Sequence, residues 1–121
     1  MNKTTFKQTK PKIFYDLMKL FEKINSANKN IAKYDRTTVI EPFILSNMAA
    51  AMRKVSTKIY EKNPLSILVG EAIQDTEMAR EFFMFYTQNT RLNYNQNFIL
   101  EVNLEFESII KQLNGWRRTL H

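Results

Sequence analysis

The sequence predicts an all-α fold, an antiparallel bundle of about four helices in one domain covering residues 11–121. Apolar residues recur at alternating steps of three and four along most of the chain, and this spacing keeps one side of a helix apolar. Only two glycines and three prolines occur among 121 residues, a composition typical of long helices with short connections. The expected helices cover approximately residues 11–34, 39–62, 64–88 and 96–114, after a basic, flexible N-terminal arm at residues 1–10.

The first expected helix, residues 11–34, begins at Pro11. Proline fits the first turn of a helix because its missing N–H would have no intrahelical partner there. The stretch from Ser26 to Asn30 consists of weaker helix formers, so we expect a bend or fraying within it. The apolar seam of this helix consists of Ile13, Leu17, Leu20, Ile24, Ala27, Ile31 and Tyr34.

The second expected helix, residues 39–62, follows a break at residues 35–38. Thr38 and Glu41 have the spacing of a capping box, in which both side chains satisfy backbone N–H groups at a helix start. Pro42 then falls in the first turn. Asn63 precedes Pro64 and is expected to end this helix, because a residue before proline disfavours helical angles. The apolar seam consists of Leu45, Met48, Met52, Val55 and Ile59.

The third expected helix, residues 64–88, contains Gly70 in its interior. Glycine costs about 1 kcal/mol relative to alanine there, which indicates a close contact or a slight kink. The apolar seam consists of Leu65, Leu68, Ala72, Ala79, Phe82 and Tyr86. A polar, asparagine-rich segment at residues 87–97 is expected to separate this helix from the next.

The fourth expected helix, residues 96–114, starts from Asn95 or Asn97 as its N-cap and stops near Gly115. Residues 98–106 also fit the alternation of a β-strand. The same apolar spacing continues well beyond that segment, however, and favours a helix. The seam consists of Ile99, Val102, Phe106, Ile109, Leu113, Trp116 and Leu120.

The chain lacks most of the side chains that catalytic sites commonly use, since cysteine is absent and His121 is the only histidine. Disulfides, thiolate ligands, a Ser-His-Asp arrangement and a histidine-ligated metal site are therefore excluded. We expect no enzymatic activity, no cofactor and no metal. A cysteine-free chain fits the reducing cytoplasm. Neither a signal-peptide core nor the roughly 20 apolar residues of a membrane-spanning helix occurs.

Charge is distributed unevenly along the chain, whose net charge is +6. Residues 1–62 hold 13 Lys and Arg against five Asp and Glu, whereas residues 63–121 hold five against seven. A basic first half attracts a polyanion such as nucleic acid or an anionic membrane. Opposite charge on neighbouring helices explains the same distribution and is the interpretation we favour. The candidate polyanion contacts are Lys3, Lys7, Lys10, Lys12, Arg117 and Arg118.

Two pairs of carboxylates share a helix face at a spacing of four residues: Glu71 with Asp75, and Glu101 with Glu105. Either pair has the oxygen atoms to hold a hard cation. Magnesium and calcium sites usually recruit oxygens from several segments, however. We therefore interpret both pairs as acidic faces that meet the basic half of the molecule.

The segment from Phe82 to Tyr86 is apolar on every side of a helix, which is wider than one neighbouring helix covers. Burial of three of these five residues in the core is the simpler explanation. The remainder then forms a surface for a partner. The candidate interaction face consists of Phe82, Phe83, Phe85 and Tyr86.

Residues 38–92 resemble the helical N-terminal region of bacterial polyhydroxyalkanoate synthases. The resemblance lies in the Asn63-Pro64 helix start, the apolar residues that follow, the aromatic segment from Phe82 to Tyr86 and the basic close at Arg91. Phasins, helical proteins that coat polyester granules, have the same general character. The resemblance implies granule association or subunit contact. It does not imply polymerisation, because the catalytic domain of the synthases, with its cysteine, aspartate and histidine, has no counterpart here.

These observations predict a non-enzymatic helical interaction protein, related to the non-catalytic part of such a synthase or to a granule-surface protein. Its expected partners are another protein, a second copy of itself or a hydrophobic granule surface. One alternative is a basic helical protein that binds nucleic acid or an anionic membrane. Another is a gene remnant without a defined activity.

Overall fold

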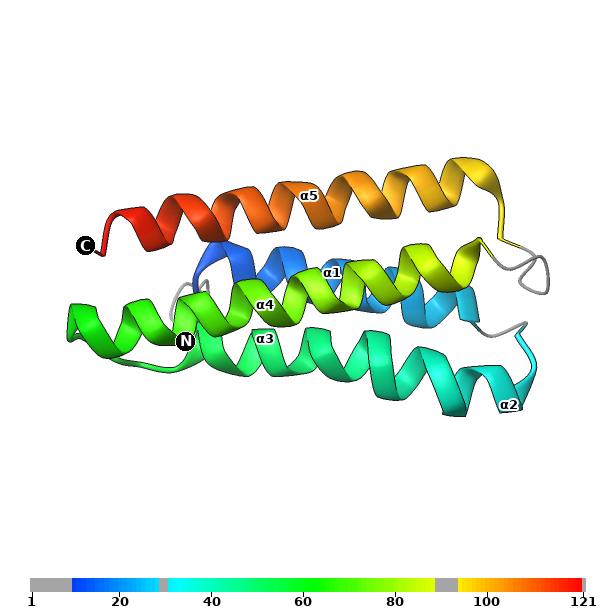
Figure 1. The fold of residues 1–121 in the computed structure, drawn as a ribbon, viewed down its shortest axis with the longest axis horizontal. Coiled ribbons are helices and arrows are strands. Elements are labelled where there is room, and N and C mark those ends of the chain that lie inside the picture. The colour runs from blue at the N-terminus through cyan, green and yellow to red at the C-terminus, as the bar shows by residue number, and fades with distance from the viewer. Residues whose placement is uncertain (1–9, 29–30, 89–93, 121) are drawn as a thin grey trace, which may run out of the picture.

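The computed structural model describes residues 10–28, 31–88 and 94–120, and in this part of the chain it is an antiparallel bundle of helices without strands (Figure 1). The all-α prediction is confirmed. The elements in chain order are α1 (Lys12–Ala27), α2 (Lys33–Asp35), η3 (Arg36–Leu45), α3 (Ser46–Ser56), α4 (Lys62–Thr87) and α5 (Gln96–Arg118). Three of them, α2, η3 and α3, follow one another without a break and together form the second long helix of the bundle.

Among the described residues the long helices, which are α1, the joined α2-η3-α3 helix, α4 and α5, are arranged in a ring, each packed against the helices before and after it. Helix α1 packs mainly against α3 and α5, and α4 packs mainly against the same two helices. Successive helices run in opposite directions, so the start of α1 and the end of α5 lie at the same end of the bundle (Figure 1).

The apolar seams predicted for the first and last helices line the core. In α1 the buried residues are Ile13, Leu17, Leu20 and Ile24. In α5 they are Val102, Phe106, Ile109 and Leu113. Both helices bury the stripe that their 3.6-residue period places on one side.

The buried face of α4 agrees with the predicted seam at Ala72, Ala79 and Tyr86 and differs from it elsewhere. The structure buries Val69, Ile73 and Phe83, whereas Leu65 and Phe82 lie only partly buried at the edge of the core. The face also includes Thr76, which is fully buried and donates from its hydroxyl to the Ala72 carbonyl oxygen at 2.8 Å. This intrahelical bond satisfies the hydroxyl group within the core.

The first helix ends earlier than predicted, at Ala27 rather than near residue 34. Tyr34 belongs to the second long helix and is 71% exposed, so it is not part of the seam of α1. The predicted weak stretch from Ser26 to Asn30 contains this helix end; Lys29 and Asn30 lie outside the described residues.

The predicted break at residues 35–38 is wrong, because the helix passes through it in a π-helical segment, η3. The capping-box prediction is wrong for the same reason: Thr38 donates from its hydroxyl to the Tyr34 carbonyl oxygen at 2.6 Å, inside the helix. Pro42 lies within η3. In an α-helical turn the proline ring would clash with the carbonyl group of the residue four positions earlier. The wider π-helical turn offers more room at that point.

Two other helix ends also differ from the prediction. Helix α3 ends at Ser56 and α4 begins at Lys62, so Pro64 falls in the first turn of α4 and an extended connection precedes it. Helix α5 starts at the predicted cap, where Asn95 Oδ1 accepts a hydrogen bond from the backbone N–H of Asn97 at 2.7 Å. It then continues through Gly115 to Arg118.

Candidate interaction surface

The aromatic segment of α4 is divided between the core and the surface. Phe83 is fully buried and Tyr86 is 6% exposed, whereas Phe85 is 70% exposed. Phe82 and Met84 lie between these extremes and pack against the core. Consecutive residues of a helix point in directions about 100° apart, so five apolar residues in a row surround it. Of the candidate interaction face, the structure therefore places Phe83 and Tyr86 in the core.

Phe83 is the centre of an aromatic cluster between α4 and α5. Its ring lies 6.0 Å from that of Tyr94, 6.4 Å from that of Phe98 and 6.2 Å from that of Phe106, measured between centroids. These distances fall in the range of favourable aromatic pairs. The cluster explains why this residue of the segment points inward.

A buried polar contact lies beside the aromatic cluster. Tyr94 donates from its hydroxyl to Asn28 Oδ1, and Asn28 is fully buried. Burial, with a smaller contribution from nearby Tyr86, raises the pKa of Tyr94 above its ordinary value. Tyr94 therefore stays neutral and remains a donor at physiological pH. The contact ties the end of α1 to the start of α5.

The outward side of α4 carries two shallow hollows separated by a ridge. One hollow, of about 380 Å³, is lined by Met78, Glu81, Phe82 and Phe85. The other, of about 400 Å³, is lined by Arg80, Glu81, Met84, Phe85 and Gln88. Glu81 and Phe85 line both hollows and are four residues apart, so they form the ridge between them.

Phe43 of η3 extends this surface beyond α4. Its ring stacks on that of Phe82, with centroids 4.8 Å apart and planes inclined by 26°. Phe43 is 42% exposed and Met78 is 45% exposed. We call the group formed by Phe43, Met78, Glu81, Phe82 and Phe85 the outer aromatic surface.

Sequence reasoning missed Phe43, Met78 and Glu81 as members of this surface. Met78, Glu81 and Phe85 follow one another at steps of three and four, a spacing that predicts a second stripe along one side of α4. Phe43 gave no such signal, because it reaches the surface only through the packing of η3 on α4.

Both predicted carboxylate pairs hold a lysine side chain from the basic half of the chain. Lys54 Nζ lies 2.6 Å from Asp75 Oδ2 and 3.9 Å from Glu71 Oε1. Lys23 Nζ lies 2.6 Å from Glu101 Oε1 and 3.1 Å from Glu105 Oε2. The interpretation of these pairs as acidic faces that meet the basic half is confirmed.

The pKa of Lys23 is raised above its ordinary value by this arrangement. The hydrogen bond to Glu101 is the largest cause, partial burial acts in the opposite direction, and Glu105 adds to the increase.

In the described part of the chain, no group of three or more histidine, aspartate or glutamate residues could hold a metal ion.

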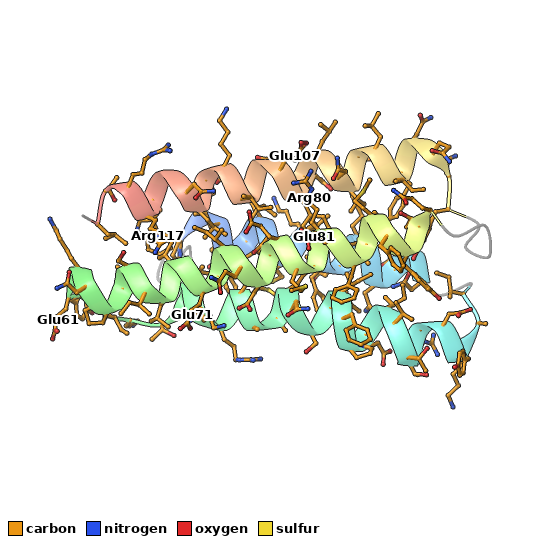
Figure 2. The ribbon with its side chains drawn as sticks, in the orientation of Figure 1. Glu61, Glu71, Arg80, Glu81, Glu107 and Arg117 are labelled. Atoms are coloured by element: carbon orange, nitrogen blue, oxygen red, sulfur yellow. The ribbon has the colours of Figure 1, made fainter. Side chains whose placement is uncertain are left out.

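Arg80 and Glu81 are neighbours in the sequence but have different surroundings (Figure 2). Arg80 points toward α5, where its Nε donates to Asn103 Oδ1 at 3.0 Å and its Nη2 lies 3.9 Å from Glu107 Oε1. The side chain of Glu81 is exposed on the outward side of α4. Within the described residues its carboxylate has no hydrogen bond or ion pair.

The candidate polyanion contacts are only partly described. Lys3 and Lys7 lie outside the described residues. Lys10 Nζ is 5.8 Å from the ring centroid of Phe14, and Lys12 Nζ is 2.7 Å from Asp16 Oδ2. Both Lys10 and Lys12 therefore already make contacts within the chain.

Arg117 and Arg118 lie at the same end of the bundle as the start of α1 (Figures 1 and 2). The guanidinium of Arg117 covers Gly70 so closely that a Cβ atom there would lie 3.0 Å from Arg117 Cζ. The close contact predicted at Gly70 is therefore confirmed. Arg118 is exposed.

Comparisons with protein-family models, with curated proteins and with solved structures found no match to this chain. Among the helices described, none has both the length and the apolar character needed to cross a membrane.

Proposed function

We propose that this chain is a non-enzymatic helical interaction protein of the cytoplasm that binds a partner protein through the outer aromatic surface. The observation that supports this proposal is the exposure of Phe85 between two hollows, one of them lined largely by apolar atoms. Leaving a phenylalanine side chain in water forgoes about 1.5–3 kcal/mol of burial free energy. Contiguous exposed apolar side chains often mark interaction sites.

The surroundings of α4 favour a surface that is formed before a partner arrives. Lys54 joins α4 to α3 on one side, and Arg80 joins it to α5 on the other. A surface fixed in this way loses little conformational freedom on binding, which favours affinity. A ridge flanked by hollows suits an amphipathic helix, whose side chains fit on both sides of a ridge.

The resemblance to polyhydroxyalkanoate synthases concerns residues 38–92, a range that contains the whole outer aromatic surface. On that basis a synthase subunit is one candidate partner. A polyester granule is a different occupant, because it offers a broad apolar surface rather than separate side chains. Binding to nucleic acid or to an anionic membrane is the electrostatic alternative, and it would depend on the lysines rather than on Phe85.

The proposal is tested with a designed amphipathic helical peptide that has leucines on one face and uncharged polar residues on the other. Fluorescence anisotropy should show binding to the wild-type protein and its loss in Phe85→Gln. Ile67→Gln is the matched control, because Ile67 lies on the same helix, is 62% exposed and lines neither hollow. Circular dichroism should show the same helicity in both variants.

Two results would contradict the proposal. One is equal weakening of peptide binding by Phe85→Gln and Ile67→Gln, which would indicate non-specific adsorption. The other is absence of peptide binding together with tight binding of duplex DNA or anionic vesicles that Phe85→Gln leaves unchanged.

A further inference from the structure

Glu81 makes no ion pair among the described residues, and neither do Glu22, Glu61 and Glu77, but of these four only Glu81 lines the two hollows. Asp16, Asp75, Glu101 and Glu105 each lie within 3.1 Å of a lysine ammonium. Glu81 is exposed on the ridge of the outer aromatic surface and has no such partner in the parts of the chain that the structure describes. The cation nearest in sequence, Arg80, points toward Asn103 and Glu107 instead.

This carboxylate restricts what can cover the surface. Any occupant that fills both hollows also covers Glu81, because Glu81 lines each of them. Removing a carboxylate from water is costly unless a cation or hydrogen-bond donor compensates it. An occupant with a positive charge at this point avoids that cost.

Two other occupants fit less well for the same reason. A purely apolar surface, such as a polyester granule, offers the carboxylate no counter-charge. A second copy of the chain that used the same surface would pair the surface with itself, as a two-fold interface does. Where the two-fold axis passes through the ridge, the two Glu81 carboxylates come close together among apolar side chains, and like charges repel.

We infer that the partner segment is a basic amphipathic helix, with apolar side chains in the two hollows and a lysine or arginine against Glu81. Apolar residues three and four positions apart on such a helix fit on either side of the ridge formed by Glu81 and Phe85. The counter-charge then fixes the register of the helix on α4. This inference rests on the proposed function, since it assigns a chemistry to the partner that the outer aromatic surface binds.

The test uses two peptides with the same leucine face, one with lysines beside that face and one with glutamates. At low salt the lysine peptide should bind wild-type protein about tenfold more tightly, since one partner charge attracts Glu81 and the other repels it. Glu81→Lys should reverse this preference, and Glu81→Gln should reduce it to about threefold or less. Phe85→Gln should weaken both peptides.

Glu22→Lys is the matched control, because Glu22 is exposed on α1 and the substitution changes the net charge by the same amount. It should leave the preference for the lysine peptide unchanged. If Glu22→Lys reverses the preference as Glu81→Lys does, overall charge explains the preference and the inference is overturned. If both peptides bind wild-type protein equally and both depend on Phe85, the inference is overturned while the proposed function stands. If neither peptide binds, both are overturned.

Discussion

The rings of Phe43 in η3 and Phe82 in α4 stack with their centroids 4.8 Å apart. This contact joins the π-helical segment to the helix that carries the aromatic segment. It also places Phe43 at the edge of the outer aromatic surface, although the two residues are far apart in the sequence. The stack therefore connects the least regular part of the backbone with the candidate interaction surface.

The stack should contribute measurably to stability. In a double-mutant cycle with Phe43→Ala and Phe82→Ala, we expect a coupling free energy of about 0.5–1.5 kcal/mol, the usual value for an aromatic pair. Urea unfolding of the four proteins provides the measurement. A cycle of Phe43→Ala with Phe85→Ala is the control, with an expected coupling near zero. Equal coupling in the two cycles would contradict a specific contact between Phe43 and Phe82.

Phe83 and Phe85 should respond oppositely to truncation, although they are two residues apart. Phe83→Ala removes the centre of a buried aromatic cluster and should lower the free energy of unfolding by about 3–5 kcal/mol. Phe85→Ala should change it by no more than about 0.5 kcal/mol, because the side chain is exposed. Thermal and urea unfolding distinguish the two. A large destabilisation by Phe85→Ala would mean that the residue supports the fold rather than a surface.

The contact between Lys54 and Asp75 should stabilise the packing of α3 on α4. Asp75→Asn should lower the free energy of unfolding by about 0.5–1 kcal/mol, since Asp75 is partly buried and its carboxylate lies 2.6 Å from the ammonium. Glu71→Gln should have a smaller effect, because its carboxylate is 3.9 Å away and more exposed. Both are measured by urea unfolding at low and high salt. Equal effects of the two substitutions would contradict the geometry.

Lys23 should make stability depend on pH in the alkaline range. Its pKa is raised in the folded protein by Glu101 and Glu105, so the folded state holds the proton more tightly than the unfolded chain. The resulting stabilisation is complete below the ordinary lysine pKa of 10.5. It is lost as the pH rises from there through the raised value.

The measurement is the difference in unfolding free energy between the wild type and Lys23→Gln at pH values on both sides of the lysine pKa. The difference should shrink above that pKa, and the contribution of Tyr94, which also titrates in the alkaline range, cancels in the subtraction. Lys19→Gln serves as the control, because Lys19 is exposed on the same helix and makes no ion pair in the part of the chain that the structure describes. A difference that is constant with pH would contradict the role of Glu101 and Glu105.

Much of the fold could be read from local patterns. The apolar seams that contain Leu17 in α1 and Phe106 in α5 each form a single stripe along the helix. Only one side of each helix was therefore apolar enough to be predicted as buried. The cap at Asn95 was readable because an asparagine side chain supplies the oxygen that a helix start lacks. The spacing of the carboxylate pairs predicted acidic faces that meet the basic half of the chain. It did not predict which lysine lies beside each pair.

The continuation of the second long helix through residues 36–45 could not be predicted from the sequence. Thr38, Glu41 and Pro42 together have the local features of a helix start, and each of them favours a break before residue 39. In the folded protein the segment buries Ile40 and Ile44, and the helix continues through it. Burial against α4 outweighs the local preference here, as tertiary packing often does.

The sequence by itself determined that the chain is helical and which sides of α1 and α5 face the core, because helix period and apolar spacing are local properties. Only the tertiary structure decided how α4 is turned. Its aromatic segment is apolar all round, so burial free energy alone does not distinguish one side from another. The neighbouring rings of Tyr94, Phe98 and Phe106 hold Phe83 inside. Phe85 is thereby left outside, beside the exposed carboxylate of Glu81.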